Sequence, residues 1–128
     1  MFEVVELNQL AAILYISISV FVIFFQFGLV FGAPWGEFTQ GGRFKGALPI
    51  SGRVLAALSI PLLMFMALSI ASVVGFVFEW DRWTAIATIA FQGVTVILNW
   101  ITPSRKEKLL WGPVTTVAFG LCSYVIYV

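Results

Sequence analysis

Long apolar stretches alternate with short polar segments along this chain. Four stretches, at about 9–31, 50–78, 83–101 and 110–128, are mainly apolar, and the segments between them hold most of the charged residues. A helix needs ~20 residues to cross a bilayer core of ~30 Å, so each stretch is long enough to span it. A strand of a membrane β-barrel would alternate apolar and polar residues, and these stretches do not. The pattern predicts an all-α membrane protein, a single integral domain (1–128) of four transmembrane helices in an antiparallel up-down bundle.

The composition supports a membrane protein and excludes several other classes. Hydrophobic residues make up 61% of the chain and charged residues 10%, whereas a soluble domain has ~25% charged residues. A net charge of +1 leaves no basic face for nucleic acid. The sequence has a single cysteine, Cys122, and this excludes an intrachain disulfide and a cysteine-rich metal site. It has no histidine, the commonest general base. We therefore expect no catalytic residues, cofactor, metal or nucleic-acid partner.

The basic residues predict how the chain is oriented in the membrane. Cytoplasmic loops of membrane proteins carry an excess of Lys and Arg. One of the seven basic residues, Arg82, lies in the second connection, and six lie in or beside the first and third. These six are Arg43, Lys45, Arg53, Arg105, Lys106 and Lys108. The distribution places the first and third connections in the cytoplasm and both termini outside.

The first connection is rich in glycine and carries three of these basic residues. Gly41 and Gly42 permit positive φ angles, and turns of this kind form nests of backbone N–H groups that bind anions. Arg43, Lys45 and Arg53 would attract an anionic lipid headgroup, at ~1 kcal/mol for each basic residue. We predict a headgroup site here. The alternative is that these charges only fix the topology.

The third predicted span carries a stripe of polar residues on one face. Five polar residues follow one another in steps of three or four, which places them within an arc of ~80°. They are Thr84, Thr88, Gln92, Thr95 and Asn99. An unpaired amide in hydrocarbon costs several kcal/mol, so the stripe is expected to face protein or water. Gln26 in the first span is the predicted partner on the opposite side of the bundle.

Two interpretations of the stripe stay open. The polar side chains could hold helices together through hydrogen bonds worth ~0.6 kcal/mol each on average. They could instead form the polar wall of a cavity that admits a small ligand. In that second case the predicted ligand-binding residues are Gln26, Thr88, Gln92, Thr95 and Asn99.

Small residues recur at a spacing of four in two of the spans. They are Gly28, Gly32 and Gly36 in and after the first span, and Ala67, Ala71 and Gly75 in the second. This spacing is typical of close helix packing, either within the bundle or between copies. The predicted partners are membrane lipids and, beyond them, a second copy of the chain or a larger membrane complex.

The acidic residues are predicted to lie outside the membrane core. Glu37 and Glu107 fall in the first and third connections, and Glu79 and Asp81 fall in the second. Proton relays of membrane proteins use ionisable groups inside the spans. We therefore expect neither a proton relay nor an enzyme.

Two segments of the sequence resemble those of a group of small four-helix membrane proteins found in many bacteria. They read GAPWGEFTQGG at 32–42, followed by LP and Arg53, and NWITPSRKEKLLWGPV at 99–114. The resemblance implies the four-helix architecture and a bacterial cytoplasmic membrane, and it implies no activity, ligand or cofactor. Small multidrug transporters also have four helices, but they carry a carboxylate in the first span, and this first span has none.

The functional hypothesis is a non-enzymatic membrane protein that binds a small polar or amphipathic molecule or a lipid headgroup. Transport of that molecule is an extension of the same hypothesis. The alternative is a structural or accessory subunit of a membrane complex, whose polar residues pair only with each other or with a partner protein.

Overall fold

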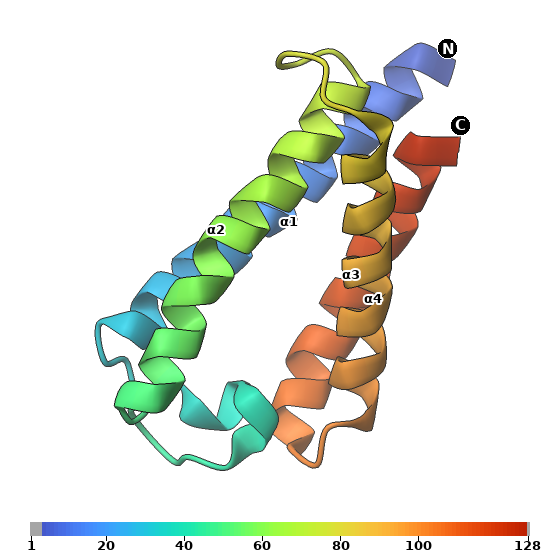
Figure 1. Cartoon of the computed structure of the whole chain (residues 1–128). Coiled ribbons are helices and arrows are strands. Elements are labelled where there is room, and N and C mark those ends of the chain that lie inside the picture. Colours follow the sequence, from blue (N-terminus) through green and yellow to red (C-terminus); the bar gives the residue numbers. More distant parts are fainter. Residues whose placement is uncertain (1–3, 128) are drawn as a thin grey trace.

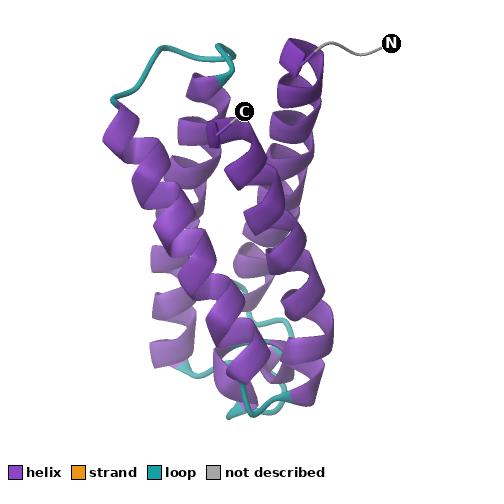
Figure 2. Ribbon diagram, turned by 90° about the vertical axis from the view of Figure 1, so that its right-hand side faces the viewer, coloured by secondary structure: helices purple, strands orange, loops and turns teal. Residues whose placement is uncertain are grey.

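The computed structural model describes residues 4–127 of the chain, and within them it consists of helices, turns and loops without a strand (Figure 2). The four long helices are α1 (Val4–Val30), α2 (Ile50–Val73), α3 (Arg82–Ile101) and α4 (Arg105–Tyr127). Two short 3₁₀ turns, η1 (Gly36–Phe38) and η2 (Gln40–Gly42), lie in the connection between α1 and α2. All four long helices are long and apolar enough to cross a membrane. The protein therefore has the architecture of a multi-pass membrane protein.

The helices form two closely packed pairs that diverge at one end of the molecule (Figure 1). α1 packs along α2, α3 packs along α4, and α1 also packs against α4. α2 and α3 lie close together near the connection that joins them and separate toward their other ends. We call the half that carries the two chain ends the termini half. The half that carries the connections 31–49 and 102–104 is called the loop half.

The main apolar core lies in the termini half. Its members include Ala12, Tyr15, Ile70, Cys122 and Val125, each at most 1% exposed. A smaller cluster of Leu29, Leu48 and Ala56 joins α1 and α2 in the loop half. These two clusters leave the centre of the loop half without an apolar core.

α2 ends at Val73, earlier than the predicted limit at 78, because a glycine terminates it. Gly75 has a φ of +82°, a left-handed conformation that glycine adopts without steric cost. The Gly75 N–H donates to the Ser72 carbonyl (3.2 Å) and the Phe76 N–H to the Ala71 carbonyl (2.9 Å), which is the Schellman pattern. The prediction that Gly75 is part of a helix-packing face was therefore wrong.

A glycine in the left-handed conformation also ends α1. Gly32 has a φ of +94°, its N–H donates to the Leu29 carbonyl at 3.2 Å, and the Ala33 N–H donates to the Gly28 carbonyl at 2.9 Å. Gly36 lies beyond the helix, in η1. Gly32 is therefore a helix cap and Gly36 part of a loop, whereas Gly28 lies inside α1 against the Trp35 ring. The three glycines do not form the predicted helix-packing face.

α4 begins earlier than predicted, at Arg105 instead of about residue 110. The Ser104 hydroxyl accepts a hydrogen bond from the Glu107 N–H (3.1 Å), so Ser104 caps the first turn. The Ser104 N–H is held by the Thr102 hydroxyl at 3.2 Å. Glu107 therefore lies inside the helix, and its predicted place in a loop was wrong.

Candidate functional site

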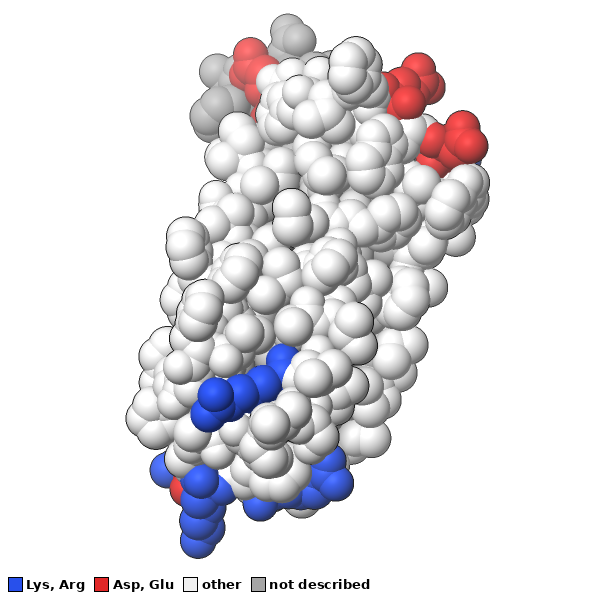
Figure 3. All heavy atoms as spheres, turned by 60° about the vertical axis from the view of Figure 1, so that its left-hand side comes forward, with Lys and Arg blue, Asp and Glu red and all other residues white. Residues whose placement is uncertain are grey.

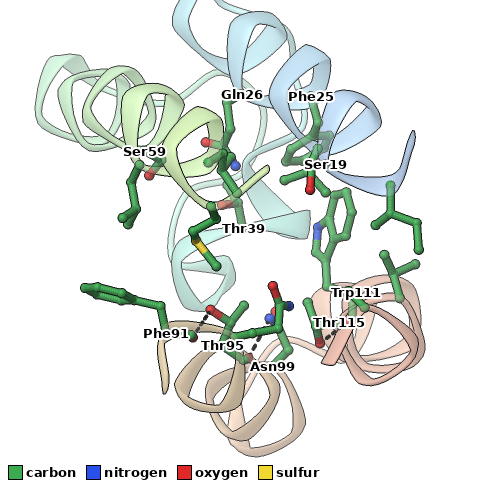
Figure 4. Close-up of a pocket in the computed structure, with 18 of the residues that line it drawn as sticks. Ser19, Phe25, Gln26, Thr39, Ser59, Phe91, Thr95, Asn99, Trp111 and Thr115 are labelled. Atoms are coloured by element: carbon green, nitrogen blue, oxygen red, sulfur yellow. Dashed lines mark hydrogen bonds between the residues drawn. The ribbon is translucent and has the colours of Figure 1, made fainter. Parts of the chain in front are cut away.

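A cavity of about 240 Å³ lies in the loop half, between all four helices (Figure 4). One water molecule needs ~10–15 Å³ in a comparable measure, so the space exceeds that of a few waters. Aliphatic and aromatic side chains form most of its wall. The polar residues that line it are Ser19, Gln26, Thr39, Ser59, Gln92, Thr95, Asn99, Glu107 and Thr115.

Four of the five predicted ligand-binding residues line this cavity, and Thr88 does not. Gln26 of α1 lies across the cavity from Thr95 and Asn99 of α3 (Figure 4). Thr88 is fully buried, with its Oγ1 2.5 Å from the Ser69 Oγ of α2. Because this pair joins α2 to α3 in the termini half, Thr88 holds helices together and lies outside the candidate site.

Gln92 marks the boundary between the two halves. Its Oε1 accepts a hydrogen bond from the Tyr15 hydroxyl at 3.0 Å, which ties α1 to α3. Gln92 also lines the cavity and is 7% exposed. Within residues 4–127 its amide nitrogen has no hydrogen-bond acceptor, so this N–H₂ group is free to interact with cavity contents.

The two residues of the α3 stripe deeper in the loop half, Thr95 and Asn99, donate only within their own helix. Thr95 donates to the Phe91 carbonyl at 2.8 Å, and the Asn99 Nδ2 donates to the Thr95 carbonyl at 2.8 Å. Among the described residues, neither the Asn99 side-chain oxygen nor the Gln26 amide has a protein partner. The cross-bundle bond predicted for Gln26 is therefore not formed. Gln26 and Asn99 are half-buried, so these polar atoms are accessible to water or to a ligand in the cavity.

Glu107 is the site residue that the sequence analysis missed. It is 9% exposed and lines the cavity. It carries the one charged side chain on the cavity wall within residues 4–127. The ion pair found in this part of the chain joins Lys106 to Glu37 and leaves the Glu107 carboxylate without a basic partner. The positive end of the α4 dipole stabilises a negative charge at this position.

Aromatic rings form the cavity wall on the α1–α4 side. The rings of Phe25 and Trp111 meet edge to face, with centroids 4.9 Å apart and planes at 72°. Phe25 also stacks on Trp35 at 5.4 Å. The Trp111 Nε1–H donates to the Phe38 carbonyl at 2.9 Å, which fixes the indole and leaves part of it lining the cavity.

The first connection forms the floor of the cavity. It passes between the loop-half ends of α2 and α4 (Figure 1), and its Thr39 is part of the cavity lining. The Ser104 hydroxyl donates to the Glu37 carbonyl at 2.5 Å, and the Gln40 Nε2 donates to the Gly52 carbonyl at 2.9 Å. These bonds attach the floor to both sides of the bundle.

The predicted headgroup residues Arg43, Lys45 and Arg53 lie in the loop half but are not part of the cavity wall. Arg43 and Lys45 are exposed, with the Arg43 guanidinium 5.3 Å from the centre of the Phe44 ring. The Arg53 Nε donates to the Leu48 carbonyl at 2.9 Å. On the face seen in Figure 3, the basic side chains gather at this end of the molecule, together with one acidic side chain, and the other acidic side chains lie at the opposite end.

Glu37 pairs with Lys106, at 2.6 Å, and not with a base of its own connection. The hydrogen bond from Lys106 and its positive charge lower the pKa of the Glu37 carboxyl from its ordinary value. The pair links the floor of the cavity to the first turn of α4 at the surface.

The cavity has a side opening between α2 and α3. Leu62 of α2 and Phe91 of α3 both line it and are 38% and 47% exposed. α2 and α3 diverge toward the loop half (Figure 1). A molecule dissolved among the acyl chains of a bilayer would meet this opening without first crossing water.

Comparison of the chain with protein-family models, with curated proteins and with solved structures found no match to any of them. The resemblance that the sequence suggests therefore stays a prediction, and the functional argument depends on the geometry of the cavity.

Proposed function

We propose that this protein binds a small amphipathic molecule in the cavity of the loop half and is not an enzyme. The observation that supports the proposal is the position of Gln26 and Asn99 on opposite sides of a cavity of about 240 Å³, where the Gln26 amide and the Asn99 side-chain oxygen have no partner among the described residues. An apolar cavity with a few convergent polar groups is typical of a site for a small molecule. Transport of the bound molecule would require an opening on a second side.

The proposal includes an orientation in the membrane. The basic residues at the loop end favour a cytoplasmic location for that end, with both termini outside, in an antiparallel bundle. The bacterial cytoplasmic membrane belongs to the same proposal through the resemblance of the segments 32–42 and 99–114. In this orientation the side opening faces the cytoplasmic leaflet.

The route into the cavity is part of the proposal as well. The floor bonds of the first connection close the cytoplasmic end, whereas Leu62 and Phe91 are exposed on the lipid side. A molecule with an apolar body can enter between α2 and α3 and place its polar group against the amides. A lipid headgroup or a free amphipathic molecule fits this geometry.

Cysteine accessibility tests whether the cavity is open. In membrane vesicles, we expect Thr95→Cys to react with N-ethylmaleimide, because Thr95 lines the cavity and bonds only to its own helix. Ser69→Cys is the matched control, since Ser69 is 0% exposed and packed against Thr88. The wild-type chain provides the blank through its fully buried Cys122. Labelling is measured as a mass increase of the intact protein.

Two outcomes would contradict the proposal. If Thr95→Cys reacts no faster than Ser69→Cys, the loop half is closed and the polar stripe only holds helices together. If Thr95→Cys becomes reactive only after a partner protein is removed in mild detergent, the cavity is an interface and the accessory-subunit alternative is correct.

A further inference from the structure

We infer that the molecule bound in the cavity is an organic cation, an ammonium group on an apolar body, with Glu107 as its counter-charge. This inference depends on the proposed function and adds the chemical class of the ligand. It differs from the sequence prediction, in which basic residues recruit an anionic group.

The charge on the cavity wall supports a cation. Within residues 4–127, Glu107 supplies the charged group of the lining, and Arg43, Lys45 and Arg53 contribute nothing to it. The Glu107 side chain is 9% exposed and has no ion pair with a described residue. A buried charge is costly unless an opposite charge accompanies it. A bound cation would provide that charge, whereas an anion would be repelled.

The neighbouring polar atoms also suit a cation. One N–H of the Asn99 amide is used by the Thr95 carbonyl, and the side-chain oxygen, an acceptor, has no donor among the described residues. Asn99 lies near the end of α3 and Glu107 in the first turn of α4, on either side of the short turn 102–104. Two oxygen acceptors at the same level of the cavity, one of them a carboxylate, would attract a cationic nitrogen electrostatically.

The aromatic wall provides a second source of recognition. Trp111 follows Glu107 by four residues on α4, so both side chains lie on the same face, one turn apart. Both line the cavity together with Phe25, whose ring contacts the indole at 4.9 Å. An organic ammonium group is attracted by the faces of Trp and Phe rings within ~6 Å. A carboxylate beside aromatic rings therefore favours an alkylated ammonium ion.

A bare metal ion fits this cavity poorly. The described residues contain no group of three Asp, Glu, His or Cys side chains that could hold a metal. Ca²⁺ requires ~6–8 oxygen ligands, and one carboxylate with one or two amide oxygens does not supply them. The apolar side opening at Leu62 and Phe91 would admit a hydrophobic body more readily than a hydrated ion.

A pair of charged thiol reagents tests the inference in the Thr95→Cys protein. Trimethylammonioethyl methanethiosulfonate is a cation and sulfonatoethyl methanethiosulfonate an anion of similar size. Each rate is divided by the rate of the same reagent with free cysteine, and the ratio of the two normalised rates is then taken. This ratio does not depend on the reactivity of the thiol in the Thr95→Cys protein, which affects both reagents equally. We expect the cation to react faster by about tenfold, the factor that ~1.4 kcal/mol of attraction gives.

In the Thr95→Cys protein, Glu107→Gln should bring the normalised rate ratio of cation to anion close to one, the value for free cysteine. Its matched control is Glu37→Gln, which removes the same charge at the same end of the molecule from an exposed ion pair outside the cavity. We expect the control to keep the preference for the cation. Because the Ser104 cap bonds to the Glu107 backbone, the variant keeps its helix start.

A binding measurement gives an independent result on the protein without an added cysteine. Benzyltrimethylammonium should raise the melting temperature of the detergent-solubilised protein in a saturable way, and benzenesulfonate should not. The stabilisation should be lost in Glu107→Gln and retained in Glu37→Gln. If Glu107→Gln does not fold, Trp111→Leu provides the second test, since it removes the aromatic face and should weaken the cation's effect.

The failure of this inference is distinct from failure of the proposed function. If both charged reagents and the maleimide leave Thr95→Cys unmodified, the cavity is closed and the proposed function is wrong. If both charged reagents modify it at equal relative rates, or if Glu37→Gln and Glu107→Gln change the ratio equally, the cavity is open but does not select cations. Stabilisation by benzenesulfonate in place of the ammonium compound would likewise overturn the inference.

Discussion

Threonine residues of the α3 stripe have different partners in the termini half and in the loop half of the bundle. In the termini half, Thr88 meets Ser69 across the α2–α3 interface at 2.5 Å. In the loop half, Thr95 belongs to the same stripe of α3, but its hydroxyl bonds to its own helix and its side chain lines a cavity. The residue types are the same, so the difference comes from the separation of α2 and α3.

This comparison shows how one helical stripe acquires two roles. Thr88 and Thr95 both donate to the carbonyl four residues earlier, at 2.9 and 2.8 Å, so the local structure does not distinguish them. What distinguishes them is whether a partner side chain lies opposite. Where the helices are close, the stripe contributes to stability. Where they diverge, its polar groups remain available for a ligand.

The largest expected effect on stability comes from the difference in side-chain packing between the two halves. Ile70→Ala removes a side chain that is 0% exposed in the core of the termini half and should lower the free energy of unfolding by about 2–4 kcal/mol. Leu63→Ala, on the cavity wall, should cost less than half as much, because the cavity already exists. Reversible unfolding in mixed micelles measures both. Equal losses would mean that the loop half is as well packed as the termini half.

The floor of the cavity provides the next test. A Cβ atom on Gly36 would lie 2.2 Å from the Phe44 carbonyl oxygen and 2.7 Å from that of Gly46, so Gly36→Ala forces the backbone apart. We expect a loss of about 1–3 kcal/mol and faster maleimide labelling of Thr95→Cys as the floor loosens. Gly120→Ala is the control, since an added Cβ there meets nothing within 4 Å. A Gly36→Ala protein as stable and as slowly labelled as this control would show that the floor does not close the cavity.

The number and type of the helices could be predicted from the sequence, because apolarity and length are local properties. The ends of α2 and α4 were predicted less well. The apolar run after Val73 continues past the helix, and only the left-handed Gly75 stops it. At the other helix, the Ser104–Glu107 spacing is a capping signal, S-x-x-E, that would have placed the start at Arg105.

The candidate site could be predicted only in part. Periodicity placed Gln92, Thr95 and Asn99 on one face, and all three line the cavity. It also included Thr88, because periodicity contains no information about how far away the next helix lies. Glu107 was missed for a different reason: its burial depends on where α4 begins and on the first connection that folds beneath it.

A smaller effect tests the polar groups directly. Gln92→Leu leaves the Tyr15 hydroxyl without its acceptor and should cost about 1–2 kcal/mol. Asn99→Leu removes no bond between helices and should change stability by less than ~0.5 kcal/mol. Unfolding of both variants in mixed micelles gives the comparison. If Asn99→Leu is as destabilising as Gln92→Leu, the α3 stripe holds helices together in the loop half as well, and the contrast between Thr88 and Thr95 disappears.

The smallest effect concerns the surface ion pair that joins the cavity floor to α4. Lys106 lowers the pKa of Glu37 below its ordinary value of 4.5. The pair's contribution is therefore present above that value and is lost as the pH falls through the lowered pKa. Because the two side chains are 59% and 33% exposed, the effect should be small. The difference in melting temperature between wild type and Glu37→Gln should narrow as the pH is lowered through the range in which the Glu37 carboxyl becomes protonated. In a Lys106→Met background, the difference in melting temperature caused by Glu37→Gln should not narrow as the pH falls. A difference in melting temperature that persists unchanged after the Glu37 carboxyl is protonated would show that Glu37 supports the floor through something other than its charge.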